Sequence, residues 1–272
     1  MRKLDKLRPI IGIGIALCVS FAVWSQVSVQ ELSHEWTVQP GGTVSGTIAV
    51  VNSGDEPHAV ELSQFDYTFA SDGRYEYLSP GEVLRSNAGW ITFQITSSHI
   101  SIPARSTLEV PYTIQVPDDT GLIGTYWSVV QVRILSPTEQ PVAQKAAGVL
   151  IRHVISYAIQ IVTHIGDTGT HDISIIGSQL SKTDDELSFE VDIENTGKRW
   201  VRPVVSLEIY TEEGDFVGRF ESQSGKQRVY PGTSVRHRIS LPGLEPGKYP
   251  AMLYIDNLDE YVWAAQVTIE VQ

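Results

Sequence analysis

Short stretches in which apolar and polar residues alternate recur along the whole chain. A period of two places apolar side chains on one face of a β-strand, and the Gly, Pro, Asn, Asp and Ser clusters between the stretches favour turns. These stretches lie at residues 43–51, 59–62, 90–95, 107–116 and 126–134, and then at 187–193, 204–210, 234–240, 249–255 and 265–271. Long segments with helical spacing are lacking, so the pattern predicts an all-β protein.

The run GVLIRHVISYAIQIV, at residues 148–162, departs from the alternating pattern. Its odd-numbered positions are apolar almost throughout, β-branched residues dominate, and its ~15 residues exceed the roughly 5–6 of a typical strand. Two interpretations are open. An exposed apolar edge of this kind indicates a partner that covers it. Alternatively, the strand is buried on both faces in the core, or is long because it switches sheets.

The two halves of the chain carry the same signals in the same order. The pairs are Asn52-Ser53-Gly54 with Asn195-Thr196-Gly197, Pro103 with Pro231, Pro117 with Pro242, and Gly124-Thr125-Tyr126 with Gly247-Lys248-Tyr249. We therefore predict two immunoglobulin-like β-sandwich domains in tandem, at 27–165 and 170–272, with 148–162 as the long last strand of the first. Residues 244–249 are typical of a tyrosine corner. One continuous sandwich is the alternative, and it leaves the repeat unexplained.

The first 25 residues have the composition of an export signal. A basic start, MRKLDKLR, precedes an apolar run and a small residue, Ser25. We interpret residues 1–25 as a cleaved signal peptide, with an uncleaved membrane anchor as the alternative. The only cysteine, Cys18, lies in this segment, so the mature chain has no disulfide. Together with the absence of Asn-x-Ser/Thr sequons, this favours a bacterial envelope protein.

Charge and motif content argue against several functional classes. The formal net charge of −12 disfavours nucleic acid as a partner. The seven histidines are scattered, so neither a metal nor a cofactor is expected. Asp-Thr-Gly occurs at 119–121 and 167–169, as in aspartic proteases, but Asp-x-Gly is also common turn chemistry. We reject the protease hypothesis on this basis and expect no enzyme.

Two further clusters have alternative explanations. The acidic residues 184–186 fit a solvated hairpin tip better than a calcium site. Tyr67, Phe69, Tyr75 and Tyr77 flank the hairpin signal Ser71-Asp72-Gly73. Aromatics at this spacing could form a carbohydrate- or protein-binding platform, whereas cross-strand pairing within the sheet is the simpler prediction.

The layout resembles that of the periplasmic pilus-assembly chaperones, the PapD-like family. The matching features are Asn52-Ser53-Gly54, the opening Tyr126-Trp127-Ser128-Val129 of the penultimate strand, the loop 135–147 and the strand 148–162. The resemblance covers most of the mature chain and implies donor-strand complementation, in which the last strand lends alternate apolar side chains to an incomplete client fold. The lent residues would be Ala147, Val149 and Ile151, with Ile155 continuing the same face.

This sequence departs from the family at the anchor for the client's terminal carboxylate. The Lys of the family's last strand falls on Ser156, and the first strand, 31–38, offers His34 and Glu35 in place of an Arg. Arg152 is the only cation in 148–162 and is our candidate anchor. The resemblance thus implies a non-enzymatic periplasmic chaperone whose partner is a secreted β-rich client, such as a pilus subunit. Membrane contact is expected only through residues 1–25, if uncleaved. The alternative is a secreted or envelope-attached structural or adhesive module.

Overall fold

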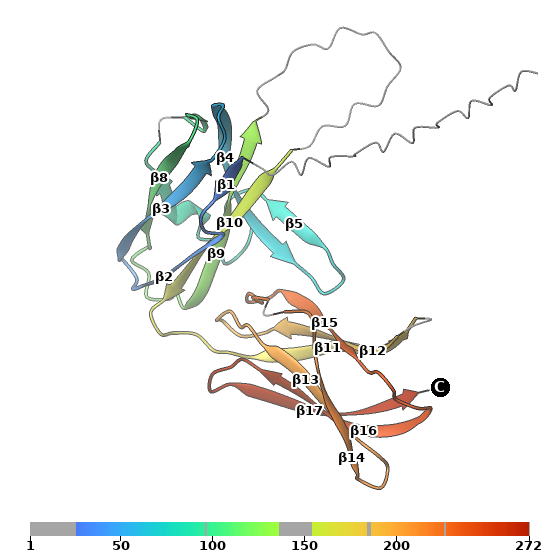
Figure 1. Ribbon diagram of the computed structural model, residues 1–272. Helices are drawn as coiled ribbons and strands as arrows, with labels where there is room; N and C mark the ends of the chain where they lie inside the picture. The colour runs from blue at the N-terminus through green and yellow to red at the C-terminus, as the bar shows by residue number, and fades with distance from the viewer. Residues whose placement is uncertain (1–25, 96, 136–153, 184–185, 226, 272) are drawn as a thin grey trace, which may run out of the picture.

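The computed structural model describes residues 26–95, 97–135, 154–183, 186–225 and 227–271, and these residues form an all-β protein (Figure 1). The only helical element among them is a short 3-10 turn, η1 (Ala88–Trp90). Within these ranges no helix has the length and apolar character needed to cross a bilayer. The predicted signal peptide, residues 1–25, and most of the loop and strand at 136–153 lie outside the described residues.

The first half of the chain forms one sandwich of two sheets. One sheet has the order β1-β3-β8-β6, and the other has the order β2-β10-β9-β4-β5, with β7 also pairing to β4. The strands are β1 (Val27–Val29), β2 (Ser33–Val38), β3 (Thr43–Asn52), β4 (His58–Phe69), β5 (Tyr75–Leu78), β6 (Ile91–Phe93), β7 (His99–Ile102), β8 (Ser106–Gln115), β9 (Gly124–Leu135) and β10 (Ser156–Ile165).

The second half forms another sandwich, whose sheets have the orders β11-β12-β15 and β14-β13-β16-β17. The strands are β11 (Ile173–Lys182), β12 (Leu187–Asn195), β13 (Val204–Tyr210), β14 (Phe216–Glu221), β15 (Ser234–Ser240), β16 (Gly247–Asp256) and β17 (Val262–Val271). The predicted class, two immunoglobulin-like sandwiches in tandem, is confirmed. The exact domain bounds, 27–165 and 170–272, stay an interpretation of the chain.

Two predicted strand bounds need correction. The strand predicted to end at residue 162 continues to Ile165, because residues 163–165 pair with both β9 and β2. Thr163 and His164 therefore belong to the sheet and not to a linker. The first strand, predicted at 31–38, is β2, which begins at Ser33, and a short strand that was not predicted, β1, precedes it in the other sheet.

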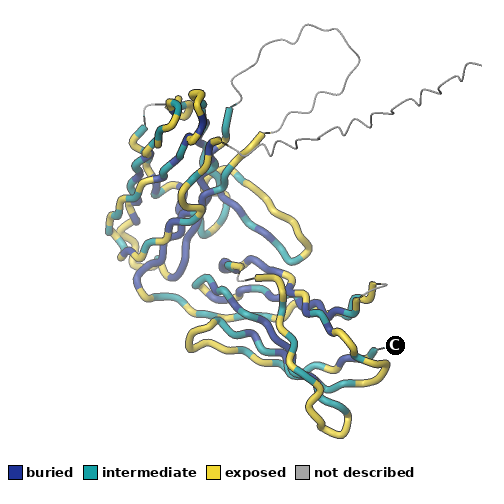
Figure 2. The backbone as a smooth tube through the Cα atoms, viewed as in Figure 1, coloured by how far each residue is buried: buried dark blue, intermediate teal, exposed yellow. Residues whose placement is uncertain are grey.

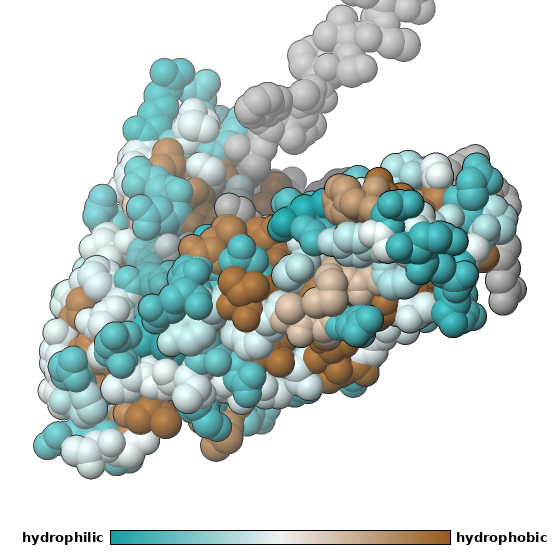
Figure 3. Space-filling view, turned by 90° about the horizontal axis from the view of Figure 1, so that it is seen from below, coloured by the Kyte–Doolittle hydropathy of each residue, from teal (hydrophilic) through white to brown (hydrophobic). Residues whose placement is uncertain are grey.

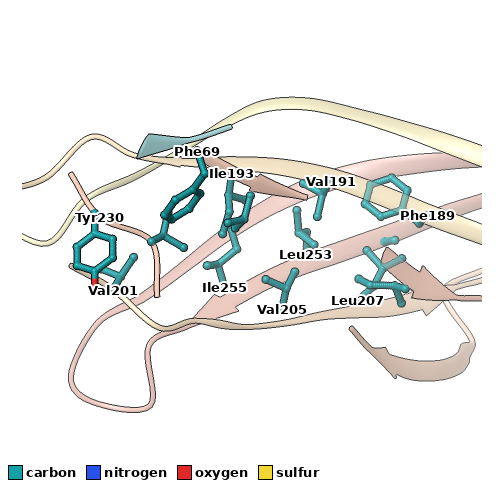
Figure 4. Close-up of a cluster of buried hydrophobic side chains, with 14 of the residues drawn as sticks. Phe69, Phe189, Val191, Ile193, Val201, Val205, Leu207, Tyr230, Leu253 and Ile255 are labelled. Carbon is teal, nitrogen blue, oxygen red and sulfur yellow. The ribbon is translucent and has the colours of Figure 1, made fainter. Parts of the chain in front are cut away.

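Strand β10 belongs to two hydrophobic clusters at once. Ile159, Ile161 and Ile165 pack in the core of the first sandwich. Val162, on the opposite face, joins a cluster that also holds Trp127 and the core of the second sandwich. Figure 2 shows buried stretches of the backbone in the centre of each sandwich, and Figure 4 shows Phe69 and Tyr230 at one end of this second cluster.

The repeated Asn-x-Gly signal has one structural role in both halves. Asn52 Nδ2 donates to the carbonyls of Glu56 and Pro103 at 2.8 and 2.9 Å, and its Oδ1 accepts from the Gly54 amide at 3.0 Å. Asn195 makes the matching set, to the carbonyls of Arg199 and Val229 and from the Gly197 amide. Each buried amide side chain thus fastens a strand end to a neighbouring turn.

The tyrosine corner predicted at 244–249 is also confirmed. The Tyr249 hydroxyl donates to the carbonyl of Glu245 at 3.0 Å, four residues upstream. This bond ties the start of β16 to the turn that leads into it.

The aromatic hairpin predicted around residues 71–73 is formed by β4 and β5. Tyr67 lies opposite Tyr77, and Phe69 lies opposite Tyr75, with ring centroids 6.4 and 5.8 Å apart. Cross-strand pairing is therefore confirmed. The hairpin reaches toward the second sandwich (Figure 1), where the Ser71 amide donates to Ser234 Oγ at 2.9 Å.

Candidate functional site

Among the described residues, strand β10 has only one neighbouring strand, β9, over its first four residues, so one of its edges is open there. From residue 160 onward it lies between β9 and β2, whereas residues 156–159 pair with β9 alone. The Gln160 amide donates to the carbonyl of Leu32 at 2.9 Å, so even-numbered residues direct their backbone groups to the β2 side. The backbone groups of Ser156 and Ala158 consequently face the unpaired side, where a further strand can hydrogen-bond.

Apolar side chains surround this open edge. Val154 and Ile155, directly before β10, are 63% and 42% exposed, and Leu32, where the chain enters β2, is 57% exposed. The Ile155 carbonyl accepts from the Ile134 amide at 3.0 Å, so the pairing with β9 begins before the strand proper. The feature is a half-paired strand with uncovered apolar groups, which soluble proteins normally avoid.

The predicted lent residues lie mostly beyond this edge. Ala147, Val149, Ile151 and the candidate anchor Arg152 are outside the described residues, so their roles stay predictions. Ile155 has the same parity as Ile159 and Ile161, which point into the first core. The odd-numbered face named from the sequence is therefore the core-directed face where the structure describes it.

The competing interpretation, a strand buried on both faces, is correct for the other end of β10. Ile161 and Val162 lie on opposite faces, and both are fully buried. Figure 2 shows the change along the strand, from exposed at Ser156 to buried near Ile165. The two interpretations therefore describe different halves of the same strand.

Arg228, from the second sandwich, sits where the open edge ends. Its Nη1 donates to Ser33 Oγ at 2.6 Å and to Gln160 Oε1 at 3.1 Å, and its Nη2 donates to Glu35 Oε2 at 3.1 Å. The buried Nε–H has no hydrogen-bond partner. Sequence patterns did not single out Arg228, because nothing local indicates that a residue from the second half reaches strands β2 and β10 of the first.

His164 connects the two sandwiches beside Arg228. Its Nε2 lies 2.8 Å from both Glu35 Oε1 and Trp200 Nε1, and its Nδ1 lies 3.0 Å from Thr125 Oγ1. One ring nitrogen cannot donate to the carboxylate and accept from the indole at once. The protonation state of His164 therefore selects its partner, Glu35 when Nε2 carries a proton and Trp200 when it does not.

Glu35 shows the electrostatic consequence of this arrangement. The hydrogen bond from His164 lowers the pKa of the Glu35 carboxyl, against a smaller opposing effect of burial, and the charge of Arg228 adds to the lowering. The carboxylate is therefore ionised at neutral pH and holds groups from both sandwiches together.

The two Asp-Thr-Gly turns do not form a catalytic pair. Asp119 Oδ1 accepts from the Gly121 amide at 2.8 Å within its own turn, and the fully exposed Asp167 lies 3.4 Å from Arg199. No interaction joins the two carboxylates, which a shared-proton dyad requires. Across the part of the chain that the structure describes, no group of three metal-ligating side chains converges.

Comparison with known proteins finds similar folds but no sequence relative. No protein-family model matches the chain, and no curated protein matches its sequence. Among solved structures, the class 5 fimbriae chaperone CfaA has 12% identity and a TM-score of 0.47, over 90% of this chain and 99% of that chain. The CsuC–CsuE chaperone–tip adhesion subunit complex of Acinetobacter baumannii has 11% identity and a TM-score of 0.45, over 88% and 97%.

A third structure is the SafA pilin of Salmonella enterica in complex with the SafB chaperone, at 12% identity and a TM-score of 0.40, over 90% of this chain and 96% of the other. Each of these three structures contains a fimbrial or pilus chaperone, the kind of protein that the sequence layout resembles.

Proposed function

We propose that this protein is a non-enzymatic chaperone of the bacterial periplasm that holds a secreted β-rich client, such as a pilus subunit, by strand addition. The observation that carries the proposal is the open edge of β10 at residues 156–159, continued upstream by an apolar alternating sequence. An unpaired edge flanked by exposed Val154 and Ile155 is an aggregation hazard unless a partner covers it.

In this proposal the client makes two kinds of contact. Backbone groups of Ser156 and Ala158 hydrogen-bond the added strand, which then continues along residues 147–153. The side chains of Ala147, Val149, Ile151 and Ile155 enter the gap in the client core. Burial of a Val or Ile side chain contributes about 2 kcal/mol, so Val149, Ile151 and Ile155 together contribute about 6 kcal/mol, to which the backbone hydrogen bonds of the added strand add.

Arg228 is our second candidate for the anchor of the client's terminal carboxylate, beside Arg152. It lies where β2 begins and the added strand must stop, and its Nε–H is free to donate. An arginine at a bidentate carboxylate site is favourable because its fork matches the two oxygens. Because Arg228 already pairs with Glu35, an incoming carboxylate would share or replace that contact.

The structural or adhesive module remains the second candidate function. It is favoured by the two-sided burial of residues 161 and 162, which shows that half of β10 is ordinary core. In that case residues 147–155 would pack against this chain itself and need no client.

A paired pulldown distinguishes the two functions. Wild-type protein and Ile151→Asp are captured from the periplasm of the native host through a C-terminal tag, and co-purifying proteins are identified by mass spectrometry. Asp at a lent position should eject the client, since an unpaired charge in an apolar groove is costly. The control is Val217→Asp, which places the same charge on an exposed apolar position of β14.

The chaperone function predicts a small β-rich protein with wild type and with the control, and none with a folded Ile151→Asp. Unfolding of Ile151→Asp, or the same proteins with all three forms, would identify residues 147–155 as core and favour the structural module. Arg152→Gln and Arg228→Gln, in the same assay, then tell which cation anchors the client.

A further inference from the structure

A pocket of 480 Å³ lies between the two sandwiches beside His164. Its walls come from β2 and β10 of the first sandwich, from the chain linking the two, and from two loops of the second, at residues 199–202 and 257–259. Arg228 does not line it, although Arg228 contacts two residues that do, Glu35 and Trp200. Its volume falls in the range of small-molecule sites.

The hydrogen-bond acceptors in this pocket are already satisfied. Glu35 uses one oxygen for His164 and the other for Arg228. Asp259 uses Oδ1 for the Tyr261 amide and Oδ2 for the Asn257 side chain. The side-chain oxygen Oδ1 of Asn257 in turn accepts from the backbone amide of Arg202 at 2.7 Å. A cation would therefore find no free carboxylate here.

Two buried nitrogens in the same pocket have no hydrogen-bond partner. The Arg202 guanidinium lies over the Trp200 ring at 5.2 Å, but its buried Nε–H has no acceptor and no carboxylate pairs with it. His171 stacks on Tyr261 with its Nδ1 buried and unpartnered. An unsatisfied buried polar group costs about 1–3 kcal/mol, so two in one pocket indicate a missing partner.

Backbone strain marks the same place. Leu258 has a φ of 63°, in the left-handed region that leucine rarely adopts, and its side chain is exposed at the pocket rim. Such strain persists where the surrounding contacts fix it, and it clusters at ligand-binding positions. The bond between the Arg202 amide and Asn257, next to Leu258, fixes this turn against the arginine loop.

We propose that this pocket binds a small oxyanion, a carboxylate or phosphate group, between the Arg202 guanidinium and the His171 ring. The unpartnered N–H groups require a hydrogen-bond acceptor. The planar guanidinium offers the forked geometry that carboxylates and phosphates match. Burial, followed by the charge of Arg199, lowers the pKa of His171. The ring is therefore neutral at pH 7 and donates from Nδ1 in one of its two tautomers.

The ligand would bridge the two sandwiches. Thr37 and His164 lie on one wall, and Arg199, Arg202 and Leu258 lie on the other. A bound anion would thus stabilise the arrangement seen here through binding linkage. This site does not depend on the chaperone proposal, because its lining excludes residues 147–159.

Calorimetric titration of the full mature chain tests the site. Phosphate and citrate are the two oxyanion probes, and chloride at matched ionic strength controls for general screening. We expect saturable binding of at least one oxyanion, weakened by about ten-fold or more in Arg202→Gln. Tighter phosphate binding would assign a tetrahedral ligand, and tighter citrate binding a carboxylate. The matched control is Arg74→Gln, which removes one charge from an exposed turn outside the pocket.

Equal heats for chloride and the oxyanions, or equal affinities in Arg202→Gln and Arg74→Gln, would overturn the proposal. Arg202→Lys and His171→Gln serve as second variants in case Arg202→Gln does not fold. Lysine keeps the charge but loses the fork, so Arg202→Lys should also bind more weakly. Unchanged affinity in both second variants would equally overturn the site.

Discussion

The two sandwiches end in last strands of equal length that differ in what covers them. Both β10 and β17 have ten residues, and each belongs to one sheet of a two-sheet sandwich. In β17 only one face is turned inward, and the other carries residues such as Gln266, Thr268 and Glu270. In β10 both faces are buried from residue 161 onward, because the second sandwich packs against the face of β10 that points away from the first core. The corresponding face of β17 is exposed to solvent.

The difference in burial explains why apolar and polar residues alternate along β17 but not along the second half of β10. Figure 3, seen from the side of the second sandwich, shows apolar residues in several groups with hydrophilic ones between them, as expected for a face without a neighbouring domain. The apolar side chains on both faces at residues 161 and 162 result from the packing of the two sandwiches. Upstream of residue 160, Ala158 still packs against the cluster that contains the second core, whereas Val154 and Ile155 are exposed.

The largest effect is expected from truncating the doubly covered strand. Ile161→Ala should lower the free energy of unfolding by about 3 kcal/mol, because the buried side chain leaves a cavity in the first core. Gln266→Ala on the exposed face of β17 should change it by less than about 0.5 kcal/mol. Urea denaturation measures both. Similar values for the two variants would show that β10 is no more tightly held than β17.

The buried asparagines offer the second comparison. Asn52→Ala and Asn195→Ala should each cost about 2 kcal/mol, because each change leaves buried carbonyl and amide groups without their partner. Near-equal losses would agree with the shared role of the two turns. A loss of stability in only one of the two variants, measured by denaturation, would show that the two turns share a hydrogen-bond geometry but contribute differently to the free energy of unfolding.

Much of this fold was predictable from the sequence, and the reasons are local. Alternation gave the strands, and the repeated Asn-x-Gly and Gly-x-Tyr signals gave the division into two halves, since turns and strand starts depend on nearby residues. Arg228 and the pocket around Arg202 were not predictable. They join residues far apart in the chain, such as Ser33 with Arg228 and Thr125 with Trp200, and no periodicity reports such contacts.

The third prediction concerns His237, a buried histidine of the second sandwich. Desolvation lowers the pKa of His237 to about 4, from an ordinary value of 6.5. Between these values the unfolded chain binds the proton that the folded chain excludes, so stability falls as the pH falls from 6.5 toward 4. The slope should approach about 1.4 kcal/mol per pH unit near pH 5.

The measurement is the free energy of unfolding of wild type and His237→Gln at pH 7 and at pH 5. The difference between the two proteins isolates this residue from the other titrating groups. We expect the wild type to lose more stability than the variant on acidification. Parallel losses in both proteins would mean that His237 titrates with an ordinary pKa in the folded state.

The smallest effect separates the two Gly-x-Tyr motifs, which look alike in sequence. The Tyr249 hydroxyl donates to the Glu245 carbonyl, whereas Tyr126 packs its ring 4.7 Å from Trp90 and beneath Arg85. Tyr249→Phe should therefore cost about 1 kcal/mol, the net value of one hydrogen bond. Tyr126→Phe keeps the ring contacts and should cost less than about 0.5 kcal/mol. Thermal denaturation resolves this difference, and equal losses would mean that a motif shared in sequence also shares its corner bond.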